Sequence, residues 1–353
     1  MNILYISSGN PTFVRKDISL LSLKYNVGTL NYEWNQINLP LNIIKQFIHI
    51  ALRIKKIDTI IVMFAGYWSV LPVLFGKFFK KNVFIILGGT DCVSYPTFNY
   101  GSLRKPLLKS AIFISLKHAT CLLPVHESLI DFTNSYFDHS KQGIKNHFKS
   151  IKTPVRTIFN GYEPIVTQKE IELSKRIPNS FITVAFVNNN VRMILKGIDL
   201  ILESAWEIPE ANFTIIGFNK KFKNQIKIPS NVTLLEHMPH NELNIKYIQS
   251  EFVINISISE GFPNALCEAM SFGCIPIISP VGAMPTIAQN IGFTIQNRNR
   301  IELSNAIKAS LNLTPEQKAT FRQLAYAQIK NNFNISQRMS KFMQTIEEFE
   351  RKN

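Results

Sequence analysis

Two glutamates, Glu260 and Glu268, bracket a turn that contains glycine, proline and asparagine. Pro263 suits the first turn of a helix because its missing N–H would have no partner there, and Gly273 suits the C-terminal end of that helix. The free amides and partial positive charge of a helix N-terminus attract phosphate or an electron-rich sugar oxygen. This stretch therefore predicts a site for an anionic, hydroxyl-rich ligand.

The elements that must position these carboxylates are two buried strands. Residues 253–258 supply an apolar run before the turn, and residues 275–278 begin another after the helix. Such a strand–turn–helix–strand order places the turn at the carboxyl edge of a parallel sheet.

Alternation of apolar strands with helical patterns continues along the whole chain, which is typical of a doubly wound α/β architecture. The strands expected in the first half are Ile3–Ser7, Thr59–Phe64, Val83–Leu87, Cys121–Pro124 and Arg156–Phe159. Those expected in the second half are Ile182–Phe186, Phe213–Gly217, Val232–Leu235, Phe252–Ile256 and Ile275–Ile278. We predict one domain over residues 1–165 and a second over 166–334, each with its own parallel sheet and with a cleft between them. A C-terminal helix at about 335–353 is predicted to pack back on the first domain.

The chain has 353 residues and a net charge of +15, which is unevenly placed. Residues 1–165 hold 19 Lys and Arg against 8 Asp and Glu, whereas the remainder holds 20 against 16. No helix-turn-helix, zinc-finger or RNA-binding signature is present, so nucleic acid is not the predicted partner. Basic clusters that lie beside apolar residues, as in residues 77–81, favour an anionic membrane surface. The alternative is a well-solvated basic surface.

The four cysteines show no Cys-x-x-Cys spacing, and no signal-peptide pattern precedes the first expected strand. We therefore expect a reduced, cytoplasmic protein. Residues 59–76 carry no charge and are long enough to cross a bilayer. Gly66 and Pro72 interrupt this run, which we interpret as the strand, turn and helix of a βαβ unit.

Several motifs resemble the retaining glycosyltransferases of family 4. Residues 260–270 read EGFPNALCEAM and resemble the E-x7-E signature of that family, and GCIPIIS at 273–279 resembles the GxPVVAS that follows it. KGIDL at 196–200 resembles KGxDxL, NGYE at 160–163 resembles NGVD, and GAMP at 282–285 is similar to GGxPE with Thr286 in place of the acid. The resemblance covers roughly residues 150–295 and implies a GT-B fold of two Rossmann-like domains that face each other across a cleft.

The resemblance implies transfer of a sugar from a nucleotide-sugar, in which negative charge grows on the diphosphate leaving group. Lys196, with Arg192 as a second cation, would stabilise that charge. Glu260 would lie near the transferred sugar, and Glu268 would bind the ribose hydroxyls. The chain contains no Asp-x-Asp pair, so we expect catalysis without a metal and without a cofactor.

Backbone N–H groups of Gly261, Phe262 and Asn264 would contact the sugar hydroxyls or phosphate of the donor, and the Asn264 side chain can add a contact. Gly9 follows the first strand, at the position where the family's first loop approaches the donor phosphate. An ordinary strand-to-helix turn is the alternative for Gly9.

The chain departs from the family in the first half. LGGTD at residues 87–91 stands where the family often carries an HGxD-like stretch, so Gly88 replaces the histidine. Asp91 could bind a donor hydroxyl, bind the acceptor or accept its proton; alternatively it caps a turn. His126 is a candidate acceptor contact, and a structural histidine is the simpler interpretation.

Together these features predict a retaining, metal-independent hexosyltransferase that moves a sugar from a UDP- or GDP-sugar to a hydroxyl of a saccharide acceptor. The acceptor would be linked to a lipid such as a polyprenyl diphosphate. The resemblance implies polysaccharide or lipopolysaccharide assembly, with the protein peripheral on the cytoplasmic face of the plasma (inner) membrane. The alternatives are a catalytically degenerate GT-B subunit that binds sugar or lipid for a partner, and a nucleotide-sugar epimerase.

Overall fold

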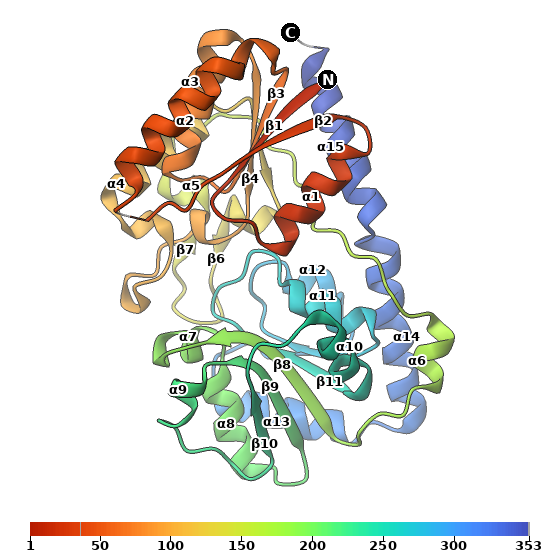
Figure 1. Ribbon diagram of the computed structural model, residues 1–353. Coiled ribbons are helices and arrows are strands. Elements are labelled where there is room, and N and C mark those ends of the chain that lie inside the picture. Colours follow the sequence, from red (N-terminus) through yellow and green to blue (C-terminus); the bar gives the residue numbers. More distant parts are fainter. Residues whose placement is uncertain (36, 352–353) are drawn as a thin grey trace. The chain divides into compact units, whose positions relative to one another are not determined.

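The computed structural model describes residues 1–35 and 37–351, which form two compact units (Figure 1). Unit 1 comprises Met1–Phe132, Lys141–Phe159 and Ser336–Asn353, and unit 2 comprises Thr133–Ser140 and Asn160–Ile335. The chain therefore passes between the units four times.

Unit 1 is built on a five-stranded parallel sheet with strand order β2-β1-β3-β4-β5. Its strands are β1 (Asn2–Ser7), β2 (Asn26–Asn31), β3 (Thr59–Met63), β4 (Asn82–Leu87) and β5 (Cys121–Pro124). Every residue of β3, β4 and β5 is buried, because helices cover both faces of the sheet.

The strands of unit 1 differ from the sequence prediction at the two sheet edges. Strand β2 was not predicted, because only Leu30 of its six residues is buried and no apolar run marks it. The predicted strand Arg156–Phe159 is wrong. Its backbone runs beside β5, with N–H groups of Arg156 and Ile158 donating to carbonyls of β5 at 2.9 and 3.0 Å, but it forms no strand.

The helices of unit 1 lie on the two faces of its sheet (Figure 1). They are α1 (Thr12–Ser22), α2 (Leu39–Arg53), α3 (Tyr67–Phe79), α4 (Pro106–His118), the short α5 (Ile144–His147) and most of α15 (Ile335–Glu350). Helices α2, α3 and α4 cover one face, and α1 and α15 cover the other. Arg338 of α15 donates to both carboxylate oxygens of Asp17 in α1 at 2.8 Å, which joins the end of the chain to its beginning.

Unit 2 contains a six-stranded parallel sheet with strand order β10-β9-β8-β11-β12-β13. Its strands are β8 (Ser180–Val187), β9 (Asn212–Phe218), β10 (Val232–Leu235), β11 (Phe252–Asn255), β12 (Ile275–Ile278) and β13 (Phe293–Thr294). Phe181, Phe213 and Phe252 stack across β8, β9 and β11, with ring centroids 5.2 and 4.9 Å apart. Strands β8 and β11 are neighbours in the sheet although β9 and β10 lie between them in the chain, so the strand order reverses at this point.

The helices of unit 2 connect these strands. They are α6 (Gln168–Leu173), α7 (Asn190–Leu195), α8 (Ile198–Glu207), α9 (Lys220–Lys223), α10 (His240–Gln249), α11 (Asn264–Ser271), α12 (Met284–Ala288), α13 (Arg300–Leu311) and α14 (Pro315–Asn332). The hairpin of β6 (Phe132–Thr133) and β7 (Lys141–Gln142) flanks the segment 133–140 that joins unit 2. Over residues 1–35 and 37–351, no helix combines the length and hydropathy that a bilayer span requires.

Candidate active site

A pocket of about 350 Å³ opens at the carboxyl ends of β8 and β11 in unit 2. It lies where the strand order of the sheet reverses, which is the usual place for a ligand in an open α/β sheet. Its polar and charged lining comes from three places: the strand ends, the α7–α8 joint and the start of α11. These lining residues are Thr183, Arg192, Lys196, Asn255, Ser257, Glu260 and Asn264.

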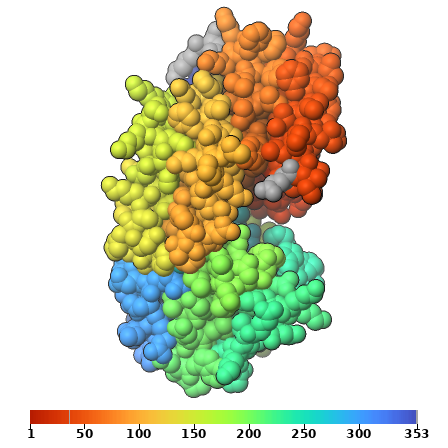
Figure 2. Space-filling view, turned by 90° about the vertical axis from the view of Figure 1, so that its left-hand side faces the viewer, coloured from red at the N-terminus to blue at the C-terminus, as the bar shows by residue number. Residues whose placement is uncertain are grey.

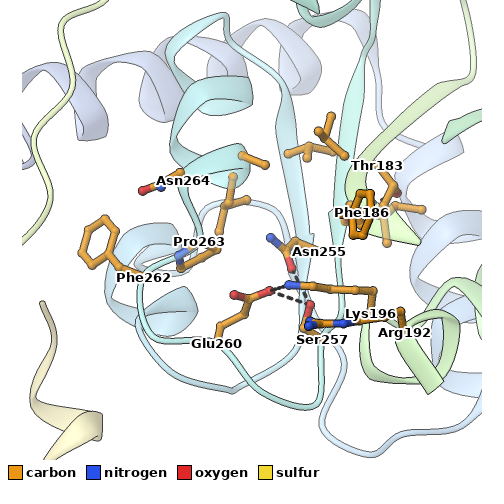
Figure 3. Close-up of a pocket in the computed structure, with 16 residues that line it drawn as sticks. Thr183, Phe186, Arg192, Lys196, Asn255, Ser257, Glu260, Phe262, Pro263 and Asn264 are labelled. Atoms are coloured by element: carbon orange, nitrogen blue, oxygen red, sulfur yellow. Dashed lines mark hydrogen bonds and ion pairs between the residues drawn. The ribbon is translucent and has the colours of Figure 1, made fainter. Parts of the chain in front are cut away.

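Lys196 and Glu260 form an ion pair in this pocket (Figure 3). Ser257 donates from its hydroxyl to the same Glu260 oxygen, Oε1, at 2.8 Å. The side chains of Lys196 and Glu260 are 25% and 15% exposed, so both remain accessible to a ligand. The two residues are 64 positions apart in the chain and meet only because β8 and β11 are neighbours in the sheet.

Two glycines fix the backbone on either side of this pair. Gly197, directly after Lys196, has a φ of +70°, and a Cβ there would lie 2.7 Å from the carbonyl oxygen of Ile256. Gly282 has a φ of +61°, and a Cβ there would lie 2.2 Å from the carbonyl oxygen of Glu260. A side chain at either position would push the backbone that carries Lys196 or Glu260 out of place.

Asn264 begins α11 and lines the pocket. Its Oδ1 accepts hydrogen bonds from Asn160 Nδ2 at 3.0 Å and from the Tyr162 hydroxyl. Because the oxygen is occupied by two donors, the Nδ2 group is the end that can serve a ligand, and it can only donate. The main-chain N–H groups of Asn264 and Ala265 also precede the first intrahelical acceptors.

Glu268 lies one turn further along α11, on the helix face that Asn264 occupies. It is half-buried and does not line the pocket itself. Tyr247 lies beside it. Burial, and secondly the Glu268 carboxylate, raise the pKa of Tyr247 well above its ordinary value. The tyrosine therefore stays protonated beside the Glu268 carboxylate.

The remaining residues predicted for the donor side lie close to this group. Arg192 lines the pocket from α7, whose start is capped by the Asn189 side chain at 2.9 Å from the Arg192 N–H. Phe262 lines it too, and its ring packs against Tyr162 and Phe333 at centroid distances of 6.3 and 5.6 Å. Gly261 accepts from the Ala283 N–H at 3.2 Å through its carbonyl.

Asp91 belongs to unit 1, where its carboxylate is 1% exposed. It accepts the backbone N–H groups of Ala65, Gly88 and Gly89 at 3.1, 3.2 and 3.0 Å. Burial raises the pKa of Asp91, and the three amides partly offset that effect. This geometry favours the turn-capping interpretation, and its role in binding or proton transfer stays a prediction.

Gly9 and His126 also belong to unit 1. Gly9, with a φ of +91°, donates its N–H to Asn31 Oδ1 at 2.8 Å, and a Cβ there would meet no atom within 4 Å. His126 is 4% exposed, and its Nδ1 accepts the Ser128 N–H at 3.2 Å, which starts a short turn. Both arrangements are those of ordinary turns; an acceptor or donor role for either residue stays a prediction.

Sequence reasoning missed Ser257, Asn160 and Tyr162 as parts of the site. Asn160 and Tyr162 lie in the NGYE stretch, so the motif was noticed, but its contact with Asn264 spans more than 100 positions. Ser257 stands three residues before Glu260, a spacing that allows a serine hydroxyl to reach a carboxylate in a tight turn. That spacing was the only available signal.

Comparisons with known proteins bear on the fold and the family of this chain. Residues 167–328 match the family model described as glycosyl transferases group 1. Similar solved structures include sucrose-phosphate synthase from Thermosynechococcus elongatus, with TM-score 0.74, 12% identity and 100% of both chains covered. They also include HepE from Anabaena in complex with UDP-glucose, with TM-score 0.68, 15% identity and coverage of 99% of this chain and 100% of that one. A glycosyltransferase from Rickettsia africae gives TM-score 0.70, 16% identity and 98% coverage of both chains. The predicted GT-B fold and the resemblance to family 4 are confirmed.

Proposed function

We propose that this chain, a glycosyltransferase of group 1 through its residues 167–328, is a retaining, metal-independent enzyme that uses a UDP- or GDP-sugar and glycosylates a lipid-linked saccharide. That the donor is a nucleotide-sugar follows from the family. The observation that carries the donor side is the Lys196–Glu260–Ser257 cluster, set beside the α11 N-terminus in one pocket.

During the transfer, negative charge develops on the departing diphosphate, and the pocket must stabilise it. Lys196 and Arg192 are the two cations in the lining, against one carboxylate, Glu260. The amide of Asn264 and the first N–H groups of α11 add donors that are already aimed before the ligand arrives. Donors fixed in advance lower a barrier because they need no reorganisation when charge develops.

We assign Glu260 a contact with the donor sugar in addition to its ion pair with Lys196. Its carboxylate is held by Lys196 and Ser257 through one oxygen, Oε1. The other oxygen has no hydrogen bond from the described part of the chain, and it is available to a sugar hydroxyl. We assign the ribose hydroxyls to Glu268, which lies one turn along α11 from Asn264 on the same helix face; this position supports the proposal.

The acceptor side rests on unit 1, whose basic and apolar surface suits a saccharide carried by a lipid. We infer that the acceptor is a saccharide on a polyprenyl diphosphate at the cytoplasmic face of the plasma membrane. Assembly of a cell-surface polysaccharide or lipopolysaccharide is the corresponding pathway.

The decisive experiment is slow hydrolysis of a panel of nucleotide-sugars by the purified protein, with and without a chelator. One UDP- or GDP-sugar should be consumed, at a rate that the chelator leaves unchanged. Lys196→Met should lower kcat/KM by about 10²–10³-fold, the cost of removing one fixed donor to a developing charge. Lys308→Met, an exposed lysine of α13, is the matched control and should behave as wild type.

Glu268→Ala tests the ribose assignment, and turnover by the wild type separates an enzyme from a degenerate binding subunit. The variant should bind the preferred nucleotide about tenfold or more weakly in calorimetry, because it loses a charged hydrogen bond to the ribose. Unaltered binding would remove the ribose assignment. Tight nucleotide-sugar binding by the wild type, with no hydrolysis and no transfer to any extracted lipid-linked saccharide, would instead favour the degenerate subunit.

A further inference from the structure

Helix α2 of unit 1 buries two amide side chains and exposes a stripe of apolar side chains. Its buried residues include Asn42 and Gln46, whose side-chain amides donate to the carbonyls of Glu33 and Trp68 at 2.8 and 2.9 Å. The outward stripe follows helical spacing and is 48–76% exposed: Leu41, Ile44, Phe47, Ile48 and Leu52. In an ordinary surface helix the apolar stripe packs against the core of the protein. The apolar stripe of α2 instead faces away from the core of unit 1.

The apolar stripe continues on α3, which packs beside α2. Phe47 of α2 contacts Phe75 of α3 with centroids 5.3 Å apart, and Phe79 stacks on Phe75 at 5.9 Å. Phe78 is 81% exposed and Leu74 is 42% exposed. These side chains line a groove of about 520 Å³ with almost no polar atoms. We call the exposed residues of α2 and α3 the α2–α3 face; Figure 2 views the side of unit 1 that these helices cover.

The charged residues around the α2–α3 face are mostly basic. Residues 34–126 hold 11 Lys and Arg against two carboxylates, Asp58 and Asp91. Asp58 accepts the Asn2 N–H at 2.7 Å, and Asp91 is buried. The cations nearest the apolar stripe lie on α2, on α3 or just after them. Lys81 is half-buried, and the others are exposed: Lys45, Arg53, Lys55, Lys56, Lys77 and Lys80.

We propose that the α2–α3 face docks on an anionic lipid bilayer, with its phenylalanine and leucine side chains at the acyl boundary and its lysines at the headgroup phosphates. A contiguous apolar patch bordered by cations matches such a surface in both polarity and charge. A second copy of the chain fits poorly, because two faces of the same positive charge would repel. This inference deepens the proposed lipid-linked acceptor, which would be reached from the same membrane.

The test is co-sedimentation of the full chain with vesicles, in the absence of any nucleotide-sugar. We expect binding to vesicles with a quarter phosphatidylglycerol, little binding to pure phosphatidylcholine, and loss of binding in high salt. The double variant Leu52→Ser/Phe78→Ser should bind about tenfold more weakly or worse. Its matched control is Leu173→Ser/Ile301→Ser, which removes two apolar side chains of unit 2 that are also well exposed, at 72% and 65%.

The charge is tested separately with Lys55→Glu/Lys56→Glu, compared with Lys220→Glu/Lys221→Glu in α9. Each basic residue near an anionic surface contributes about fivefold in binding, so the first variant should weaken binding by well over tenfold and the second should not. Equal binding to neutral and anionic vesicles would overturn the proposal. Vesicle binding that the unit 1 variants leave unchanged would also overturn it. So would a dimer, seen in light scattering, that Leu52→Ser/Phe78→Ser dissociates.

Donor hydrolysis, measured on the same proteins without vesicles, keeps this inference distinct from the proposed function. All four variants should hydrolyse the donor as wild type does, because none touches the unit 2 pocket. A wild-type protein that binds anionic vesicles but hydrolyses no donor would count against the enzyme and leave the α2–α3 face in place.

Discussion

At the scale of single residues, the site depends on side chains that are held before any ligand arrives. Glu260 is fixed by Lys196 and Ser257, and Asn264 by Asn160 and Tyr162. In each case a residue that faces the pocket is oriented by another that the sequence places far away or marks only weakly. Preorganised groups of this kind save the reorganisation that would otherwise raise a barrier.

His126 gives a prediction about pH. Burial lowers the pKa of this histidine, so the unfolded chain takes up a proton before the folded chain does as the pH falls below about 6.5. Its contribution to stability is therefore complete above that pH and is lost as the pH falls through the folded-state pKa. His126→Asn keeps a side-chain acceptor for the Ser128 N–H but cannot titrate.

Urea unfolding at pH 7.5 and 5.5 measures this effect. The unfolding free energy of wild type should fall more steeply than that of His126→Asn, by no more than about 1.4 kcal/mol per pH unit for one proton. Identical pH dependence of the two proteins would mean that His126 stays accessible to protons in the folded chain.

At the scale of elements, ion pairs of different burial help to attach the last helix to unit 1. Arg338 of α15 is buried and contacts Asp17, which is 2% exposed, and it also donates to the carbonyls of Ile158 and Phe159 at 3.0 and 2.8 Å. Arg156 and Glu348 form a second ion pair to α15, at 2.8 Å, but with side chains 45% and 34% exposed. The two pairs join the same helix and differ chiefly in burial.

Arg338→Met should therefore destabilise the protein by about 3–5 kcal/mol, because it leaves the Asp17 carboxylate buried without a counter-charge. Arg156→Met is the matched control and should cost less than about 1 kcal/mol, as exposed pairs do. The measurement is the midpoint of denaturant unfolding for each variant, compared at an unchanged slope m. The double variant Asp17→Asn/Arg338→Met should recover part of the loss, and equal costs for the two single variants would contradict this account.

At the scale of the whole molecule, a short segment from the first half of the chain, Thr133–Ser140, belongs to unit 2. Within Thr133–Ser140, Asn134 Nδ2 donates to the Ile258 carbonyl at 2.9 Å and the Tyr136 hydroxyl donates to the Ile256 carbonyl at 3.3 Å. Burial raises the pKa of Tyr136, so its hydroxyl keeps the proton that it donates. These two bonds flank Ser257, which holds Glu260.

Asn134→Ala/Tyr136→Phe should loosen that loop, because each lost bond leaves a carbonyl near Ser257 without its donor, at a cost of about 1–3 kcal/mol. Hydrogen exchange in peptides covering residues 256–262 should become faster, and donor hydrolysis should fall. Peptides from β8, residues 180–187, serve as the internal control and should not change. Unchanged exchange at 256–262 would show that the segment does not support the site.

Much of the fold could be predicted from the sequence because parallel α/β strands are local apolar runs. Strands β10 and β12 begin and end where the patterns of Val232–Leu235 and Ile275–Ile278 predicted. Strand β2 could not be predicted in this way, because an edge strand with one buried residue has no apolar pattern. The opposite error occurred at residues 156–159, which the sequence predicted as a strand although this segment only hydrogen-bonds to β5 without forming one.

The sequence by itself determined the donor-site motifs EGFPNALCEAM and KGIDL, the basic character of the first half and the alternation of strands and helices. Each of these features depends only on residues that are neighbours in the chain. Only the tertiary structure decided which of these residues meet. It brought Lys196 to Glu260, aimed the amide of Asn264, moved residues 133–140 into unit 2 and turned the apolar stripe of α2 outward. Such outcomes depend on contacts between distant positions and on which face of a helix the core already fills, and no local pattern contains either.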